Sequence, residues 1–213
     1  MFYLKDIIAD TILPFISAII LSSSYKRLTA AFKIMCYYIW VIVIIFSVTN
    51  ILADYRINNL FLYHLFTLVN VFFVSMFLYK SFLIKIKPAI FILINTAIII
   101  GCIVNLVFFE SIKTLDMNMV IVSNFIILCL CFVSFMNAIM ENDLIRLIKP
   151  SHFLFLFGIF IYAVSSIAIY SYFKYKNYQG KELSNNLWFF HDNVLIIKYV
   201  IFILASFLCI RNK

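Results

Sequence analysis

The stretch NNLFLYH at residues 58–64 leads directly into an apolar run that continues to Tyr79. The same pattern returns as NNLWFFH at residues 185–191 and opens the last apolar run of the chain. Polar residues followed by aromatic and aliphatic side chains are typical of the point where a helix enters a membrane. The repeat therefore predicts two membrane helices that begin on the same side, each with its histidine about one turn inside.

The repeat allows two interpretations. Asn, Leu and Phe are frequent in this chain, so the two copies can be a coincidence of composition. Alternatively, His64 and His191, two of only three histidines, mark a paired polar site at one end of a helix bundle. For the third histidine, His152, an interfacial position at a helix start is the simpler interpretation.

The composition predicts an integral membrane protein. Of the 213 residues, 66% are hydrophobic and 12% are charged, and the mean hydropathy is +1.09. A globular chain of this length cannot bury so much apolar surface. The apolar runs are about twenty residues long, which suits helices across a hydrocarbon core of about 30 Å, and they lack the alternation of barrel strands. We therefore expect an all-α, polytopic transmembrane helical bundle that forms one domain over residues 1–213.

Seven membrane spans are expected. The first, residues 7–21, is short, with Thr11 as the expected N-cap and Pro14 in the opening turn; whether it crosses the membrane or lies on the surface is left open. Pro88 and Pro150 stand at helix starts, where the missing backbone N–H costs nothing. The other six expected spans are residues 34–52, 60–79, 88–109, 117–140, 151–173 and 188–210.

Basic residues predict the orientation, because cytoplasmic loops carry an excess of Lys and Arg. Six fall on the side of the N-terminus and of both histidine motifs: Lys5, Arg56, Lys113, Lys174, Lys176 and Lys181. Ten fall on the other side: Lys26, Arg27, Lys33, Lys80, Lys85, Lys87, Arg146, Lys149, Arg211 and Lys213. We therefore expect a bacterial inner-membrane protein with its N-terminus outside, its C-terminus in the cytoplasm and both motifs at outer helix ends.

The net charge of +8 follows from the same short loops. Basic residues close to anionic headgroups each gain about 1 kcal/mol. Contact with the lipid bilayer therefore accounts for the positive charge, and no nucleic-acid partner is expected.

Polar residues within the expected spans indicate a binding site. Thr67 and Asn70 lie about 60° and about 120° round the helix from His64, so the three form one polar arc that descends from the outer surface. Lys198 lies only about 20° round from His191 and two turns deeper. An ionisable residue inside a membrane is costly, and by default it marks a functional hypothesis.

We therefore expect a ligand-binding cavity that opens to the outside. Its candidate residues are His64, Thr67, Asn70, His191, Lys198, Asn50 and Asn124. Asparagine also stabilises contacts between membrane helices, by about 0.6 kcal/mol. We interpret three further asparagines in this way: Asn95, Asn105 and Asn137.

No cofactor, no metal and no enzymatic activity are expected. A lysine midway along a seventh helix also occurs in retinal proteins, but the third helix offers only Thr67 and Asn70 where a carboxylate counter-ion would lie. A zinc or haem site would use His64 and His191 as ligands, with Asp54 or Asp192 as a third zinc ligand. Two histidines on separate helices indicate such a site only weakly. The motifs H-E-x-x-H and G-x-S-x-G of hydrolytic enzymes are absent from the sequence.

The helix entries at residues 59–67 and 187–191 resemble those of a group of small, uncharacterised seven-helix bacterial membrane proteins. Members of the group are often encoded beside two-component sensor kinases. The resemblance implies a receptor-like role with a sensor kinase as partner. In the group an acid often stands three residues after the threonine, and Asn70 occupies that position here.

The expected function is therefore that of a receptor-like sensory or signalling component with an outward-facing polar pocket. The alternative is a small transporter or permease. The two motif copies stand four helices apart and enter the membrane in the same direction, as in a 3+1+3 parallel repeat with a site between its halves.

Overall fold

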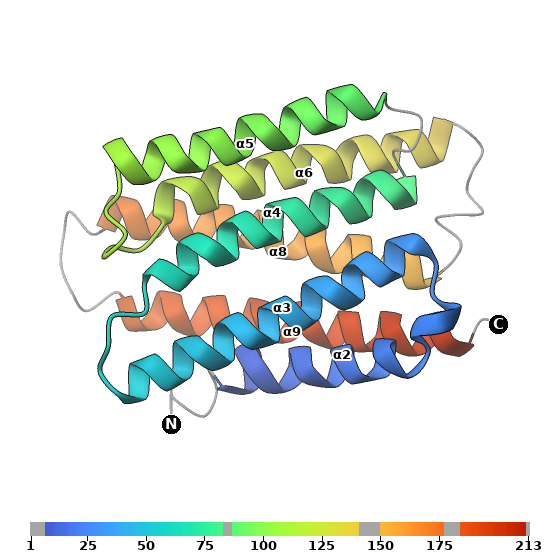
Figure 1. Cartoon of the computed structure of the whole chain (residues 1–213), viewed down its shortest axis with the longest axis horizontal. Coiled ribbons are helices and arrows are strands. Elements are labelled where there is room, and N and C mark those ends of the chain that lie inside the picture. The colour runs from blue at the N-terminus through green and yellow to red at the C-terminus, as the bar shows by residue number, and fades with distance from the viewer. Residues whose placement is uncertain (1–6, 83–86, 141–149, 177–183, 212–213) are drawn as a thin grey trace.

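The computed structural model describes residues 7–82, 87–140, 150–176 and 184–211, and for residues 138, 140, 176 and 184–188 it describes the backbone alone. Within these ranges the chain forms seven α-helices, which Figure 1 shows side by side. They are α2 (Leu13–Ser23), α3 (Ala30–Asp54), α4 (Phe61–Phe82), α5 (Pro88–Phe108), α6 (Met117–Met140), α8 (Pro150–Lys176) and α9 (Ser184–Arg211). The prediction of an all-α helical bundle is confirmed.

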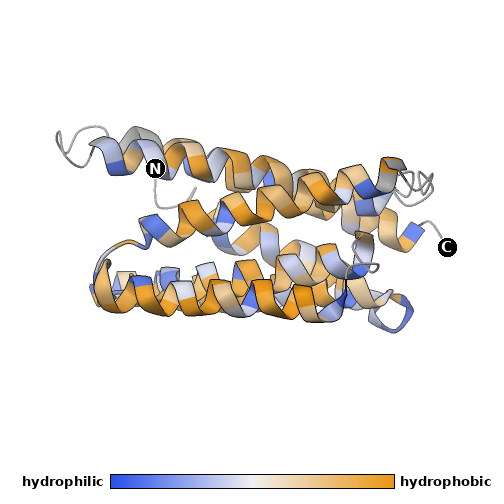
Figure 2. Ribbon diagram, turned by 90° about the horizontal axis from the view of Figure 1, so that it is seen from above, coloured by the Kyte–Doolittle hydropathy of each residue, from blue (hydrophilic) through white to orange (hydrophobic). Residues whose placement is uncertain are grey.

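The surface of the bundle is apolar. Six helices, α3 to α9, are long and apolar enough to cross a membrane, and Ile8–Ser23 forms a shorter apolar helix. Figure 2 shows hydrophobic residues along most of their length, with hydrophilic residues gathered near the ends. On α5, Leu93, Val107 and Phe108 are 69%, 66% and 74% exposed. Such a surface is stable in contact with lipid and not in water, so the chain is an integral membrane protein that contacts the bilayer.

Six helices form a closed ring in the order α2, α3, α4, α6, α8 and α9, and α9 packs back against α2. Helix α5 lies outside this ring against α4 and α6, along the upper edge of Figure 1. The ring therefore places α4 opposite α9. Its order suits the 3+1+3 plan, with α2 to α4 as one half, α6 to α9 as the other and α5 between them in sequence.

The first helix begins differently from the prediction. A π-turn, η1 (Ile8–Ile12), continues directly into α2, and a 3₁₀ turn, η2 (Tyr25–Arg27), follows α2. Thr11 therefore lies inside a helical turn, and the expectation that it caps the helix is wrong. Its hydroxyl instead accepts a hydrogen bond of 3.2 Å from the Asn50 side chain of α3.

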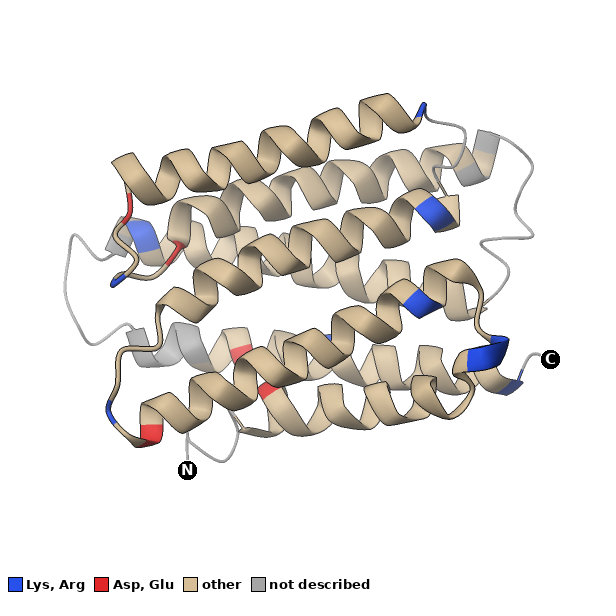
Figure 3. Cartoon of the chain, viewed as in Figure 1, with Lys and Arg blue, Asp and Glu red and all other residues tan. Residues whose placement is uncertain are grey.

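The two ends of the bundle differ in charge, as Figure 3 shows. The acidic end carries the carboxylates of the described ranges: Asp10, Asp54, Glu110, Asp116 and Asp192. The basic end carries most of the described cations: Lys26, Arg27, Lys33, Lys80, Lys87 and Arg211. Both histidine motifs open helices at the acidic end.

Four phenylalanines fill the interior of the ring in the half nearer the basic end. Phe155 lies 5.7 Å from Phe32, 5.9 Å from Phe77 and 4.9 Å from Phe202, measured between ring centroids. These four side chains come from α8, α3, α4 and α9, and none is more than 3% exposed. We call them the phenylalanine cluster; they close the centre of the bundle on that side with packed, apolar rings.

Candidate functional site

The two asparagines of the first motif fix the entry of α4. The Asn59 side chain donates a hydrogen bond of 3.0 Å to the Thr49 carbonyl of α3. The Asn58 side-chain oxygen accepts one of 3.0 Å from the Leu60 backbone N–H. These bonds tie the start of α4 to the preceding helix. They give the repeated asparagines a local structural role and set His64 in the first turn of α4.

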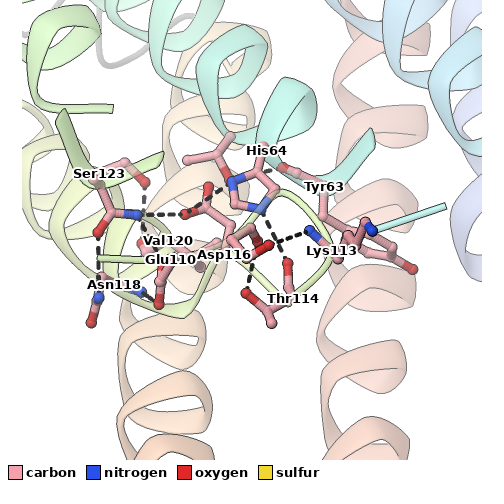
Figure 4. Close-up of polar contacts among 12 residues, drawn as sticks. Tyr63, His64, Glu110, Lys113, Thr114, Asp116, Asn118, Val120 and Ser123 are labelled. Carbon is pink, nitrogen blue, oxygen red and sulfur yellow. Dashed lines mark hydrogen bonds and ion pairs between the residues drawn. The ribbon is translucent and has the colours of Figure 1, made fainter. Parts of the chain in front are cut away.

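His64 faces the connection between α5 and α6, residues 109–116 (Figure 4). Its Nε2 atom lies 3.1 Å from the Thr114 carbonyl oxygen, and its Nδ1 atom lies 3.7 Å from Asp116 Oδ1. A carbonyl oxygen only accepts hydrogen bonds, so Nε2 must carry a proton. Nδ1 is therefore the ring nitrogen that faces the Asp116 carboxyl group.

Two carboxyl groups meet beside this histidine. The Asn105 amide nitrogen donates to Glu110 Oε2 at 2.7 Å and reaches Asp116 Oδ1 at 3.5 Å. Asn118 donates its backbone N–H to Glu110 Oε1 at 3.0 Å and its side-chain amide to Asn105 Oδ1 at 3.3 Å. The Lys174 ammonium of α8 donates to the Asn118 side-chain oxygen. We call the following residues the acidic-end cluster: His64, Thr67, Asn105, Glu110, Thr114, Asp116 and Asn118.

The environment of Asp116 favours its neutral form. The residue is 2% exposed, and burial raises the pKa of its carboxyl group to about 6. The nearby His64 side chain lowers this pKa, whereas the Glu110 carboxyl raises it both by its charge and by a hydrogen bond; a hydrogen bond with Thr67 lowers it. Asp116 is therefore a carboxyl group that exchanges its proton in mildly acidic solution.

Sequence reasoning missed most of this cluster. It found His64 and Thr67, but it did not single out Glu110 or Asp116, and it interpreted Asn105 as a contact between helices. The available signal was the short connection at residues 109–116, which holds both acids between two apolar runs. A connection of that length keeps both carboxyl groups close to the ends of α5 and α6.

His191 lies in a different cluster. Its Nε2 atom is 3.4 Å from the Tyr170 hydroxyl, its Nδ1 atom is 3.8 Å from Asp192 Oδ1, and its ring packs edge-on against Tyr162. Helices α4 and α9 stand opposite each other in the ring, so the structure does not pair the two histidine-bearing helices as direct neighbours. Tyr170 lies between the two histidine clusters, within electrostatic range of Asp116.

Lys198 is buried in an aromatic cage, with only 1% of the residue exposed. The distances from its Nζ atom to four ring centroids are 4.1 Å for Tyr162, 5.0 Å for Tyr199, 5.5 Å for Tyr38 and 5.6 Å for Phe202. The negative faces of aromatic rings attract an ammonium group and partly replace the water that it has lost.

The Tyr38 hydroxyl brings two predicted site residues together. It accepts a hydrogen bond of 3.1 Å from Lys198 Nζ and donates one of 2.7 Å to Asn70 Oδ1. This chain of contacts joins α9, α3 and α4 through the interior of the ring. Asp10 of η1 lies within electrostatic range of Lys198.

The contacts of three other predicted site residues, Thr67, Asn50 and Asn124, complete the description. Thr67 is 2% exposed and donates to the Tyr63 carbonyl one turn above it at 3.1 Å. Asn50 ties α3 to η1, and Asn124 donates to the Val120 carbonyl of its own helix at 2.8 Å. The structure therefore connects Thr67 with His64 and Asn70 with Lys198, whereas Asn50 and Asn124 make separate contacts.

Among the described residues, no group of three or more His, Cys, Asp or Glu side chains is arranged to hold a metal ion. In the acidic-end cluster, a hydrogen-bond donor, the Asn105 amide, occupies the position between the two carboxyl groups. A donor in this position disfavours a metal ion between the two carboxyl groups.

Comparison with known proteins assigns no family. The chain matches no protein-family model, no curated protein and no solved structure.

Proposed function

We propose that this integral membrane protein is a receptor-like sensory component of the bacterial inner membrane, with its acidic end in the periplasm. One observation carries the proposal: among the described residues, the polar groups of the interior extend from the acidic end to about the middle of the bundle, where Asn70 and Lys198 lie. They form two groups: the acidic-end cluster, which includes Thr67 on α4, and the chain of contacts from Asn70, one turn deeper on α4, through Tyr38 to Lys198. Beyond Lys198 lies the phenylalanine cluster.

A one-sided polar network supports detection rather than transport. A transporter needs access to its site from both sides in turn. Toward the basic end, the described polar contacts are local pairs between neighbouring helices, such as Ser17 with Ser206 at 3.1 Å and Ser75 with Asn95 at 2.6 Å. Such pairs stabilise helix packing without forming a path.

The excess of basic residues supports a cytoplasmic position for the basic end. Signal output from that side passes through short connections or through a partner. A sensor kinase is the partner that the resemblance of the helix entries implies, and we include it in the proposal.

The ring order favours one second candidate, a small transporter. Two three-helix halves around a linker helix that lies outside the ring are an arrangement on which alternating access can be built. In that case the phenylalanine cluster would act as a closed inner gate.

Reconstitution into lipid vesicles separates the two candidates. With a pH-sensitive dye inside the vesicles and an imposed proton or cation gradient, the sensory function predicts no flux above that of protein-free vesicles. It also predicts altered hydrogen exchange in residues 109–116 when the pH on the acidic-end side changes. Sustained flux that Phe155→Ala increases would support the transporter and contradict the sensory proposal.

A further inference from the structure

We propose that the acidic-end cluster is a proton-binding site, in which Asp116, Glu110 and His64 share a proton that solvent supplies. The inference rests on the proposed sensory function, whose input it names as the proton. Three features of the cluster carry it: the facing acceptors of His64 and Asp116, the contact between the two carboxyl groups, and the absence of a buried cation within the described cluster.

The first feature is the contact between His64 and Asp116. The Thr114 carbonyl fixes a proton on His64 Nε2, so a neutral imidazole presents a lone pair at Nδ1. An ionised Asp116 presents only lone pairs at Oδ1, which lies 3.7 Å away. Two acceptors that face each other in a buried site are unfavourable, and one proton on either atom removes the conflict.

The second feature is the pair of carboxyl groups. Asp116 and Glu110 lie close enough to hydrogen-bond each other, and the same Asn105 amide nitrogen lies 2.7 Å from Glu110 Oε2 and 3.5 Å from Asp116 Oδ1. Two ionised carboxylates are acceptors only, so a direct hydrogen bond between them needs a proton on one of them. A like charge at such short range also favours retention of that proton, as in other carboxyl pairs.

The third feature is the distribution of charged and titratable groups around Asp116. They are Tyr63 and His64 on α4, Cys102 on α5, Glu110 and Lys113 in the connection, and Tyr170 and Lys174 on α8. Both lysines are exposed, so water screens their charges, and Lys174 reaches the cluster only through Asn118. A proton is therefore the positive charge that the interior of the cluster can gain. A pKa of about 6 for Asp116, raised by burial, places this gain within the range of ordinary environmental pH.

The arrangement also specifies a proton over a larger cation. A metal ion between the carboxyl groups would meet the Asn105 amide nitrogen, which donates hydrogen bonds and carries no free lone pair. The members come from α4, α5, the connection at residues 109–116 and α6, so proton binding acts on the contacts that hold the peripheral helix α5 against the ring. Through these contacts a bound proton can change the packing of α5 against α4 and α6.

Infrared difference spectroscopy of the full chain in lipid nanodiscs tests the proposal. Between pH 8 and pH 5, the wild type should gain the C=O stretching band of a protonated carboxyl group, with half of the amplitude near pH 6. Asp116→Asn should lose this band. Glu110→Gln should move the midpoint to lower pH, and His64→Gln should move it to higher pH, because the two neighbours act on Asp116 in opposite directions.

Asp54→Asn is the matched control, because it removes an exposed carboxylate from the same end of the bundle. It should leave the band and its midpoint unchanged. A band that is absent from the wild type, or that persists in Asp116→Asn, overturns the proton site but leaves the sensory function open for another ligand. A normal band together with sustained proton flux in vesicles overturns the sensory function and leaves the proton site in place.

Discussion

Lys198 donates a hydrogen bond of 3.1 Å to the Tyr38 hydroxyl through the interior of the helix ring. The Tyr38 hydroxyl in turn donates a hydrogen bond to Asn70, so α3, α4 and the distant α9 share one buried chain of polar atoms. Within this chain of contacts, the Tyr38 hydroxyl group alone links Asn70 to Lys198. Its removal therefore tests the link directly.

Tyr38→Phe should lower the free energy of unfolding by about 1 kcal/mol, because Lys198 and Asn70 each lose a buried partner while the ring remains. The measurement is thermal unfolding in detergent. Tyr55→Phe is the control, because Tyr55 is 75% exposed at the end of α3. Lys198→Met should make the loss from Tyr38→Phe smaller, since the two residues belong to one network. Equal stability of the Tyr38 and Tyr55 variants would contradict the link.

Asp116 should make stability depend on pH. Its pKa is about 6 in the folded protein and 3.8 as the ordinary value. The folded state therefore binds more protons in this interval, and the stabilisation is fully present below about pH 4 and is lost as pH rises through about 6. The melting temperature of the wild type should fall by about 5 °C between pH 5 and pH 8 relative to that of Asp116→Asn. Parallel curves for the two proteins would show that Asp116 does not titrate in this range.

Gly158 and Gly101 should respond differently to alanine. A Cβ atom at Gly158 would lie 2.9 Å from Phe202 Cε1 and 3.3 Å from Ile201 Cγ2, whereas one at Gly101 meets nothing within 4 Å. Gly158→Ala should therefore destabilise the contact of α8 with α9 by about 1–3 kcal/mol. Gly101→Ala should be neutral or slightly stabilising, because alanine favours the helix. Unfolding in detergent distinguishes them, and equal effects would argue against the close packing at Phe202.

The two histidines should act independently on stability. His64 contacts Thr114 and Asp116, whereas His191 contacts Tyr170 and Asp192. Both His64→Ala and His191→Ala should insert and accumulate, and the effects on unfolding free energy should add within about 0.5 kcal/mol in the double variant. A larger interaction energy would indicate one shared site.

Hydropathy was sufficient to predict the helices, because a segment of about twenty apolar residues in a membrane must satisfy its own backbone hydrogen bonds, as a helix does. The helix wheel placed Thr67 beside His64 correctly, since both lie on one helix. The helix wheel could not identify Tyr38 as part of the site, because Tyr38 contacts Asn70 and Lys198 only when three separate helices pack together. The structure does not pair the helices of His64 and His191 as neighbours for a related reason: a repeated motif defines the entry of two helices, but not their positions in a ring.

Glu110 and Asp116 illustrate a second limit. Sequence patterns treat loop acids as solvated charges, and most are. The burial of Asp116 depends on how α4 and α5 close over the connection, which no local pattern encodes. The π-turn at η1 is similar, because a threonine before a proline is a typical helix start until the preceding turn is seen to continue the helix.

Labelling of single added cysteines with a membrane-impermeant thiol reagent tests the central claim that the acidic-end cluster faces outward. Ser111 is exposed in the connection beside the cluster, and Lys26 is exposed at the basic end. Ser111→Cys should react in intact cells, and Lys26→Cys should react only after the membrane is permeabilised, with the wild type as the background control. Reaction of Lys26→Cys but not of Ser111→Cys in intact cells would place the cluster in the cytoplasm and contradict the outward-facing sensory site.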